Sequence, residues 1–230
     1  MTASNFYENM YTDNTQDRIK LPFLYRKLRR FELHRVDGAC QLAPGGDSLL
    51  EIGCGDGGLL FRLKHKYNQL WGIDIAPSAV KRVIDRAGSE SKIHARVEDV
   101  NGDIGFEDAK FDTIIALAVM EHIFDPYHFI SLCRRLLRPG GVLIIEVPNV
   151  AFLPNRLRLL FGVVPRTSDE GATGYDAGHL HYFTRRSLRE LVENDGFKVV
   201  KMTACGIFPK LRRLWASLLC GDILILAKKL

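Results

Sequence analysis

From residue 48 onward, short apolar segments alternate with longer segments in which apolar residues recur at helical spacing. The first pattern is typical of buried strands and the second of amphipathic helices. Strands are expected at 48–53, 69–74, 93–97, 111–117 and 141–147. Helices are expected at 57–66, 77–87 and 125–137. The regular alternation of the two patterns predicts an α/β fold built on a parallel sheet.

Two of the helices have clear boundary signals in the sequence. Asp125 is suited to an N-cap and Pro126 to the first helical turn, and the sequence RPGG ends the helix that they begin. A later helix is expected from Thr184 to Asp195, with Gly196 as its stop. These signals define both helices independently of their apolar spacing.

The C-terminal third of the chain departs from the simple alternation. Apolar segments near 197–203 and 222–228 predict two strands that close the sheet as an antiparallel pair. The stretch 148–183 is too long for a plain connector. We therefore expect it to be an inserted lid that covers the functional site.

Composition limits the protein class. The chain has 230 residues, of which 47% are hydrophobic and 26% charged, as in an ordinary globular domain. Its polar start predicts no secretory signal, and no apolar run is long enough for a membrane span. The five cysteines are scattered and form no C-x-x-C pair, which favours a reduced, cytoplasmic protein.

Positive charge is concentrated near the N-terminus. The net charge is +5, and seven basic residues lie between Arg18 and Arg35 against Glu32 alone. Leucines and a phenylalanine in this segment follow helical spacing, so residues 1–44 are expected to form a helical segment or lid. Its basic face is either simply solvated or a contact for an anionic substrate or lipid headgroups.

The sequence GCGDGG follows the first predicted strand and opens a helix. It matches G-x-G-x-x-G through Gly53, Gly55 and Gly58, and Asp74 ends the next predicted strand. This arrangement suits an adenosine ligand, because the backbone approaches the ligand closely and a carboxylate meets the ribose hydroxyls. The pattern alone does not separate a nicotinamide cofactor from S-adenosylmethionine.

Four further features favour S-adenosylmethionine. Glu51 precedes the glycines, where a carboxylate would repel a pyrophosphate but suit a cationic amino-acid group. Glu98 and Asp99 end the third predicted strand, where a carboxylate suits the adenine amino group. No tyrosine has a lysine four positions later, as short-chain dehydrogenases require, and no P-loop pattern occurs.

In this order, the motifs resemble those of class I S-adenosylmethionine-dependent methyltransferases. LLEIGCGDG, WGIDIA, VEDV and FDTIIALAVMEHIFDP are similar to the first four motifs of that family, and GHLHYFTRRSLRELVENDGFKVV resembles its branch of ubiquinone-biosynthesis O-methyltransferases and glycan or small-molecule methyltransferases. The resemblance covers 45–230. It implies a Rossmann-like, seven-stranded, mostly parallel sheet with helices on both faces, an antiparallel closing pair and a helical lid insertion.

The same resemblance implies which residues contact the cofactor. The glycine backbone would approach the methionine part beside Glu51, Asp74 would hold the ribose, and Asp99 would meet the adenine amine. The implied cofactor-binding set is Glu51, Gly53, Cys54, Gly55, Gly57, Asp74, Ile75, Asp99, Leu117 and Met120.

Methyl transfer to a hydroxyl also needs a base, which aids such steps by roughly 10²–10⁴-fold. His122 follows the fourth predicted strand and is the expected catalytic base, with Glu121 orienting it or acting itself. The alternative is that Glu121 forms an ion pair and His122 packs under the lid. The resemblance associates E-x-x-E-H at this place with a divalent metal in some enzymes, but Ala118 stands at its first position, so no metal is expected.

The sequence GHLHYF supplies candidates on the substrate side. His179 and His181 alternate and would point the same way in an extended segment, with Tyr182 beside them. They are interpreted as a metal pair, as acceptor-site residues or as structural imidazoles, and the resemblance favours the acceptor site. The segments 149–165 and 208–221 mix basic and apolar residues, which suits a lid, a dimer contact or a lipid surface.

We therefore predict a methyltransferase that acts on a small-molecule hydroxyl, such as a sugar, a glycan precursor or a quinone-like metabolite. Contact with a membrane or a lipid-linked substrate is a further expectation. A nucleic-acid methyltransferase is an alternative, although the chain lacks the [DNS]-P-P-[YF] motif and a Pro-Cys nucleophile, so no nucleic-acid partner is expected. The other alternative is a non-catalytic binding subunit with the same fold.

Overall fold

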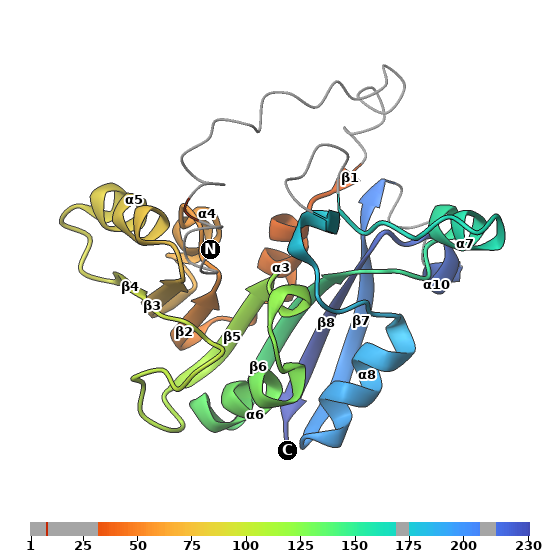
Figure 1. The fold of residues 1–230 in the computed structure, drawn as a ribbon. Helices are drawn as coiled ribbons and strands as arrows, with labels where there is room; N and C mark the ends of the chain where they lie inside the picture. The colour runs from red at the N-terminus through yellow and green to blue at the C-terminus, as the bar shows by residue number, and fades with distance from the viewer. Residues whose placement is uncertain (1–7, 9–31, 169–174, 208–214) are drawn as a thin grey trace.

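The computed structural model describes residues 8, 32–168, 175–207 and 215–230 (Figure 1). The basic segment between Arg18 and Arg35 lies mostly outside the described residues, as does half of the segment 208–221. Among the helices that the structure does describe, none is long and apolar enough to span a bilayer.

The strands form one eight-stranded sheet in the order β1-β7-β8-β6-β5-β2-β3-β4. The strands are β1 (Glu32–Leu33), β2 (Gly46–Ile52), β3 (Tyr67–Asp74), β4 (Ile93–Val97), β5 (Phe111–Leu117), β6 (Leu137–Pro148), β7 (Phe197–Ile207) and β8 (Asp222–Lys229). The five strands from β6 to β4 are parallel, and β8 pairs antiparallel with both β6 and β7. The predicted parallel sheet and antiparallel closing pair are thus confirmed. The two-residue β1, paired with the edge strand β7, is an addition that the sequence pattern did not predict.

Helices cover both faces of the sheet, as expected. The helices are α3 (Arg35–Leu42), α4 (Gly58–Leu63), α5 (Pro77–Ala87), α6 (Pro126–Leu136), α7 (Leu153–Leu160), α8 (Arg185–Asn194) and α10 (Ala216–Leu219), with 3₁₀ turns η3 (Met120–His122) and η4 (Tyr175–Gly178). Buried residues of α3, α4 and α5 belong to one hydrophobic cluster, and those of α6 and α8 to the other.

Alternation along the central strand explains this two-sided core. In β5, Ile114 and Ala116 contribute to the cluster under α6 and α8, while Ile115 contributes to the cluster under α3 and α4. Successive side chains of a strand point to opposite faces, so a strand buried on both sides reads as a continuous apolar run. The apolar runs of the sequence therefore mark the central strands.

The predicted helix boundaries follow the caps in the structure. The Asp125 carboxylate accepts hydrogen bonds from the backbone N–H groups of Tyr127 and His128 and begins α6. Thr184 and Ser187 form a reciprocal capping box at the start of α8. Such side-chain caps satisfy backbone donors that have no partner inside the helix.

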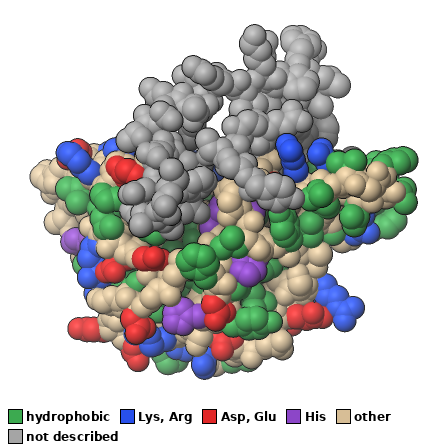
Figure 2. Space-filling model, viewed as in Figure 1, with side chains coloured by type: hydrophobic (Ala, Val, Ile, Leu, Met, Phe, Trp, Pro, Cys, Tyr) green, Lys and Arg blue, Asp and Glu red, His purple; other side chains and the backbone are tan. Residues whose placement is uncertain are grey.

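The insertion at 148–183 leaves the sheet and returns to it at one place. Asn149 forms a β-bridge with Phe183, and its side-chain amide donates to the Cys220 carbonyl at 2.7 Å. The insertion carries α7, whose apolar side chains are exposed to an unusual extent. Leu160 and Phe161 are 75% and 79% exposed, and Figure 2 shows hydrophobic side chains gathered in this region.

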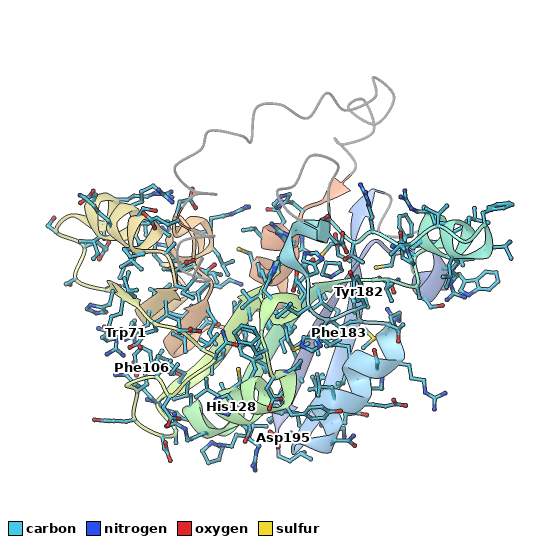
Figure 3. The ribbon with its side chains drawn as sticks, in the orientation of Figure 1. Trp71, Phe106, His128, Tyr182, Phe183 and Asp195 are labelled. Carbon is cyan, nitrogen blue, oxygen red and sulfur yellow. The ribbon has the colours of Figure 1, made fainter. Side chains whose placement is uncertain are left out.

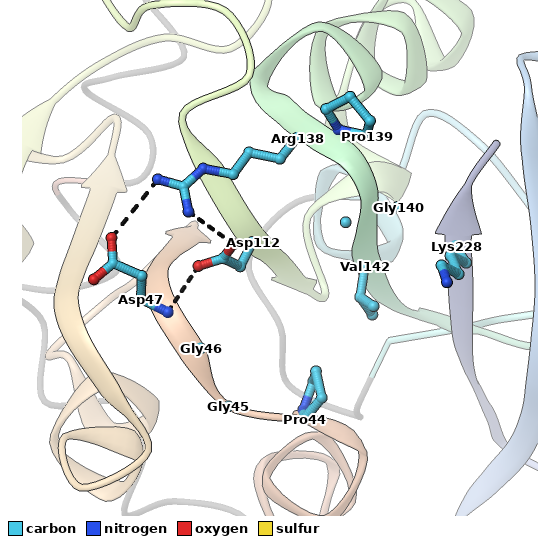
Figure 4. Close-up of a pocket in the computed structure, with 11 residues that line it drawn as sticks. Pro44, Gly45, Gly46, Asp47, Asp112, Arg138, Pro139, Gly140, Val142 and Lys228 are labelled. Carbon is cyan, nitrogen blue, oxygen red and sulfur yellow. Dashed lines mark hydrogen bonds and ion pairs between the residues drawn. The ribbon is translucent and has the colours of Figure 1, made fainter.

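A cavity of about 480 Å³ opens at the amino ends of the parallel strands, away from the glycine turn. Arg138 lies there between Asp47 and Asp112 (Figure 4). Asp112 also accepts hydrogen bonds from the backbone N–H groups of Asp47 and Ser48, at 2.7 and 2.8 Å. The structure therefore gives Asp112 the structural role of joining β5 to the start of β2.

Candidate functional site

The glycine turn after β2 is built from backbone conformations that favour glycine. Gly53, Gly55 and Gly57 have φ values of 71°, 54° and 76°, in the left-handed region. The N–H groups of Gly53 and Cys54 both donate to the Ile73 carbonyl, at 2.8 and 3.0 Å. The turn is thereby held against the carboxyl end of β3, and it leads directly into α4.

Close packing around this turn leaves no room for extra side-chain atoms. A Cβ atom on Gly53 would overlap Cγ2 of Val119, and one on Gly72 would lie 2.9 Å from Sγ of Cys54. The Cys54 thiol is buried, which raises its pKa and makes it a packing group rather than a nucleophile. The turn is therefore a close backbone surface, as the sequence predicted.

Asp74 ends β3 and joins the two loops of the predicted cofactor site. Its two carboxylate oxygens accept hydrogen bonds from the N–H groups of Gly55 and Ala76, each at 2.9 Å. Burial raises the pKa of Asp74, and these N–H groups oppose the rise. A carboxylate oxygen has a second lone pair, so the side chain can brace the turn and still accept hydrogen bonds from a ligand.

Glu51 is a buried carboxylate beside the turn. Its side chain is 6% exposed, and its Oε2 atom has no hydrogen-bond partner among the described residues. Burial raises the pKa of Glu51 well above its ordinary value, and the negative charges of Asp56 and Asp74 add to the rise. Burying a carboxylate without a partner is costly, so this position fits a ligand that brings a cation.

The other predicted cofactor residues lie around the same edge of the sheet. Asp99 follows β4, is exposed, and accepts hydrogen bonds from the backbone and side chain of Asn101 at 3.0 and 2.8 Å. Leu117 ends β5, Met120 is fully buried behind it, and Ile75 follows β3. The carboxyl ends of parallel strands share one edge, which explains how these distant positions come together.

A second cluster lies just beyond β5. Glu121 and His122 belong to η3, and His179 follows η4 at the end of the insertion. Each of the three residues offers a ligand atom, and these atoms all lie within 4.8 Å of one another. The rings of His122 and His179 are 4.7 Å apart, and Nε2 of His179 lies 4.0 Å from Oε1 of Glu121. Backbone N–H groups at 180 and 181 donate to the Glu121 carbonyl and hold the two segments together.

Burial affects the pKa values of Glu121 and His122 in opposite directions, which changes the choice of base from the His122 that the sequence favoured. Burial and the neighbouring His179 lower the pKa of His122 to about 4, so its imidazole is neutral and weakly basic at pH 7. Burial raises the pKa of Glu121 to about 7. A base is most effective when its pKa is near the working pH. The structure therefore favours Glu121 over His122 as the stronger base.

His179 and His181 do not form the pair that alternation suggested. His179 faces Glu121, whereas Nε2 of His181 lies 3.2 Å from the Phe124 carbonyl. Tyr182 is 40% exposed and precedes Phe183, where the chain rejoins the sheet (Figure 3). Of the three candidates His179, His181 and Tyr182, only His179 lies in the cluster with Glu121 and His122.

Three polar residues of this region were not predicted from the sequence. Asp176 and Thr167 support His179 from behind, through hydrogen bonds of 2.9 Å between the two and 2.6 Å from Thr167 to His179. Glu146 in β6 is 1% exposed, its carboxylate oxygens have no hydrogen-bond partner in the described part of the chain, and Arg35 lies 4.0 Å away. A lone glutamate within the apolar run of β6 was the available signal.

Comparisons with known proteins agree with this geometry. A family model described as "Methyltransferase domain" matches residues 23–202. The chain is 29% identical over 164 residues to a probable S-adenosylmethionine-dependent methyltransferase of Mycolicibacterium smegmatis, covering 67% of this chain and 53% of the relative. It is 34% identical over 113 residues to a ubiquinone biosynthesis O-methyltransferase of Xanthomonas oryzae, covering 48% and 47%. The chain thus spans about half the length of these curated relatives.

Solved structures share the fold. A putative methyltransferase of Haloferax volcanii, in complex with the Trm112 methyltransferase activator, superposes with a TM-score of 0.69 at 15% identity, covering 99% of both chains. A methyltransferase of Methanosarcina mazei superposes with a TM-score of 0.63 at 23% identity, covering 86% of this chain and 99% of the other. At these identities the likeness concerns the architecture alone.

Proposed function

Because the chain belongs to the class I S-adenosylmethionine-dependent methyltransferases, we propose that it methylates a hydroxyl oxygen of a small-molecule acceptor. The observation that carries the proposal is the contact between two sites. The glycine turn meets Val119, and the buried cluster begins two residues later at Glu121. A cofactor on the turn would therefore lie beside groups able to bind and ionise a hydroxyl.

The cofactor side fits S-adenosylmethionine, which supplies a methyl group made electrophilic by its sulfonium. Glu51 has a buried oxygen without a hydrogen-bond partner in the structure described, and it would hold the cofactor's ammonium group. Asp74 would accept the ribose hydroxyls while it braces Gly55 and Ala76. The left-handed turn at Gly55 and Gly57 carries no side chains at these two positions, which would allow the ligand to approach its backbone closely.

The acceptor side must align the hydroxyl, remove its proton and exclude water. Glu121 is 1% exposed and has a pKa of about 7, so it is suited to taking that proton. His122 and His179 lie against it as neutral imidazoles and would orient the acceptor oxygen. The insertion at 148–183 would cover the acceptor, because its return segment carries His179 into the cluster.

We propose an acceptor with apolar character, such as a quinone-like phenol or a lipid-linked sugar. Support comes from the relative named for ubiquinone biosynthesis and from the exposed apolar side chains of α7. Leu157, Leu160 and Phe161 are exposed beside Arg156 and Arg158, a combination suited to an anionic lipid surface. The same surface would bring a membrane-dissolved acceptor to the site.

The test combines binding with product analysis. Calorimetry should detect S-adenosylmethionine binding to the purified chain. Methyl-labelled cofactor is then supplied with separate pools of phenols, nucleotide sugars and RNA, and the labelled atom is located by NMR. Methylation of a phenol or sugar oxygen supports the proposal. Label on RNA, nitrogen or carbon, or a chain that binds no cofactor, would refute it.

A matched pair of variants tests the buried cluster. Glu121→Gln should lower turnover by about 10²–10⁴-fold, the usual worth of a base, with cofactor affinity unchanged. Glu107→Gln removes a charge from an exposed carboxylate and should leave turnover unchanged. Equal turnover in the two variants would exclude Glu121 from the reaction.

A further inference from the structure

We propose that Glu121, His122 and His179 bind a divalent transition-metal ion on the acceptor side of the site. Metal binding itself follows from the geometry, whereas the role given to the ion rests on the proposed function. The proposal departs from the sequence expectation, which found only two donors because Ala118 occupies the first position of the E-x-x-E-H pattern. The structure supplies the third donor from a segment that lies 57 residues after His122 in the chain.

The spacing of the three donors suits such an ion. Their ligand atoms lie within 4.8 Å of one another, and the Glu121 to His179 separation is 4.0 Å. Two ligand atoms of a tetrahedral Zn²⁺ ion, each bonded at about 2.1 Å, lie about 3.4 Å apart. Side-chain shifts of about 1 Å would therefore bring all three atoms to bonding distance.

The carboxylate of Glu121 is the observation that points to a cation. It is 1% exposed, and neither of its oxygens has a hydrogen-bond partner within the described ranges. A buried carboxylate is costly unless a donor or a cation compensates it. Its oxygen and Nε2 of His179 face each other across 4.0 Å. A metal ion between them would satisfy both.

The hydrogen bonds of the imidazoles prepare them as ligands. Nδ1 of His122 lies 3.3 Å from the Gly178 carbonyl, which can only accept, so this nitrogen carries the proton and Nε2 the lone pair. A metal-binding histidine typically donates its other N–H to a carbonyl or carboxylate in this way. The backbone around Gly178 therefore fixes the useful tautomer of His122.

A longer relay fixes His179. The Thr167 hydroxyl has one hydrogen, which it donates to a carboxylate oxygen of Asp176 at 2.9 Å. Its oxygen must then accept the Nδ1–H of His179, at 2.6 Å. Nε2 of His179 is left with the lone pair that faces Glu121. Asp176 also accepts from the N–H and hydroxyl of Ser168, at 2.9 and 2.7 Å, so the relay is firmly held.

Three protein ligands leave at least one coordination position open, as in catalytic zinc sites. An acceptor hydroxyl bound there would ionise more easily, and its proton would pass to solvent. The resulting oxygen anion would form the new O–CH₃ bond while the S–CH₃ bond breaks. The electron pair of the broken bond would stay on sulfur, which becomes a thioether. With such an ion bound, Glu121 would act as a ligand, and the ion would lower the pKa of the acceptor hydroxyl.

The test uses the untagged full chain, freed of metal by chelation and then dialysed against Zn²⁺. Elemental analysis should find about one ion bound per chain, and Co²⁺ substituted for it should give visible d–d absorption. His179→Ala should abolish both signals. Thr167→Val should weaken binding by about 10–100-fold, the usual effect of losing an outer-shell partner. His181→Ala should change neither signal, because His181 is hydrogen-bonded to the Phe124 carbonyl and is not one of the three proposed ligands.

Cofactor calorimetry on the same samples separates the possible failures. His179→Ala should bind S-adenosylmethionine like the wild-type chain, which shows that the variant is folded. If the wild-type chain binds cofactor but takes up no ion, or if His179→Ala and His181→Ala bind metal equally, the metal site is refuted and the proposed methyl transfer stands. If no cofactor binds while metal does, the proposed function fails and the metal site stands.

Discussion

Replacing Gly53 by alanine tests whether the glycine turn is a close backbone surface. The residue has φ 71°, and its new Cβ atom would overlap Cγ2 of Val119. Two separate costs are therefore expected, one from the left-handed backbone and one from the overlap. Gly162→Ala provides the matched control, because Gly162 has φ 72° and a Cβ atom added there would meet nothing within 4 Å.

The two costs can be assigned magnitudes. A left-handed conformation costs a residue with a Cβ atom about 1–2 kcal/mol, and overpacking in a close-packed interior costs typically about 1–3 kcal/mol. Gly53→Ala should therefore lower the free energy of unfolding by about 2–5 kcal/mol, and Gly162→Ala by about 1–2 kcal/mol. A second change, Val119→Ala, should recover the overlap component but not the backbone component.

Urea unfolding of the single and double variants measures these free energies, and a double-mutant cycle isolates the Gly53–Val119 coupling. Calorimetry on the folded fraction measures cofactor affinity, which should fall in Gly53→Ala and stay unchanged in Gly162→Ala. Equal destabilisation by both glycine substitutions, or a cycle without coupling, would show that Val119 does not press against the turn.

Four further outcomes are expected. Glu51→Gln should weaken cofactor binding about 10–100-fold, because a charge-assisted hydrogen bond is lost. The urea midpoint should not fall, because the substitution removes a buried charge. A lower midpoint with unchanged cofactor affinity would contradict this prediction. Asp74→Asn should lower the free energy of unfolding by about 1–3 kcal/mol, because the new side-chain NH₂ group must face the N–H donor of either Gly55 or Ala76. It should also weaken cofactor binding. Weaker binding with unchanged stability would show that Asp74 does not brace the turn. Burial alone would raise the pKa of Asp112, but the N–H groups of Ser48 and Asp47 and the Arg138 guanidinium lower it. Its stabilisation is therefore full above its unfolded pKa of about 3.9 and is lost as the pH falls below that value, so Asp112→Asn should flatten the acid decline of the urea midpoint. Phe161→Ser should reduce binding to anionic vesicles with stability changed by less than about 0.5 kcal/mol, and unchanged vesicle binding would argue against α7 as a lipid contact.

Local signals made much of the fold predictable. Asp125 and Thr184 cap helices with groups two or three residues away, and the glycine turn needs only the neighbouring strand ends. Such features depend on short stretches of chain, so sequence patterns report them well. The apolar runs also identified the central strands, because a strand buried on both faces has no polar alternation to obscure it.

The cluster of Glu121, His122 and His179 was less predictable, because it depends on contacts between distant parts of the chain. His179 meets Glu121 only through the path of the insertion, and spacing within GHLHYF suggested a partnership with His181 instead. The order of basicity is set by burial, which raises the pKa of Glu121 and lowers that of His122. Neither the path nor the burial can be derived from the residue types, so the sequence favoured His122 as the base and left Glu121 as the group that orients it or acts itself.

Three buried carboxylates at one edge of the sheet link stability to ligand binding in this methyltransferase. Glu51 is the penultimate residue of β2, Glu121 follows β5, and Glu146 lies in β6. Each has a buried carboxylate oxygen without a hydrogen-bond partner among the described residues. Burial raises the pKa of both Glu51 and Glu146, and nearby negative charges add to the rise: Asp56 and Asp74 at Glu51, Asp222 and Glu121 at Glu146. The ligand-free fold therefore bears a cost that cations can relieve: an ammonium group at Glu51, a metal ion at Glu121 and the Arg35 guanidinium near Glu146. Since a ligand that binds only the folded state adds RT ln(1 + [L]/Kd) to stability, cofactor and metal should each raise the unfolding temperature. Because the two ligands compensate different carboxylates, their separate stabilising effects should add, reduced only by the repulsion between their two positive charges.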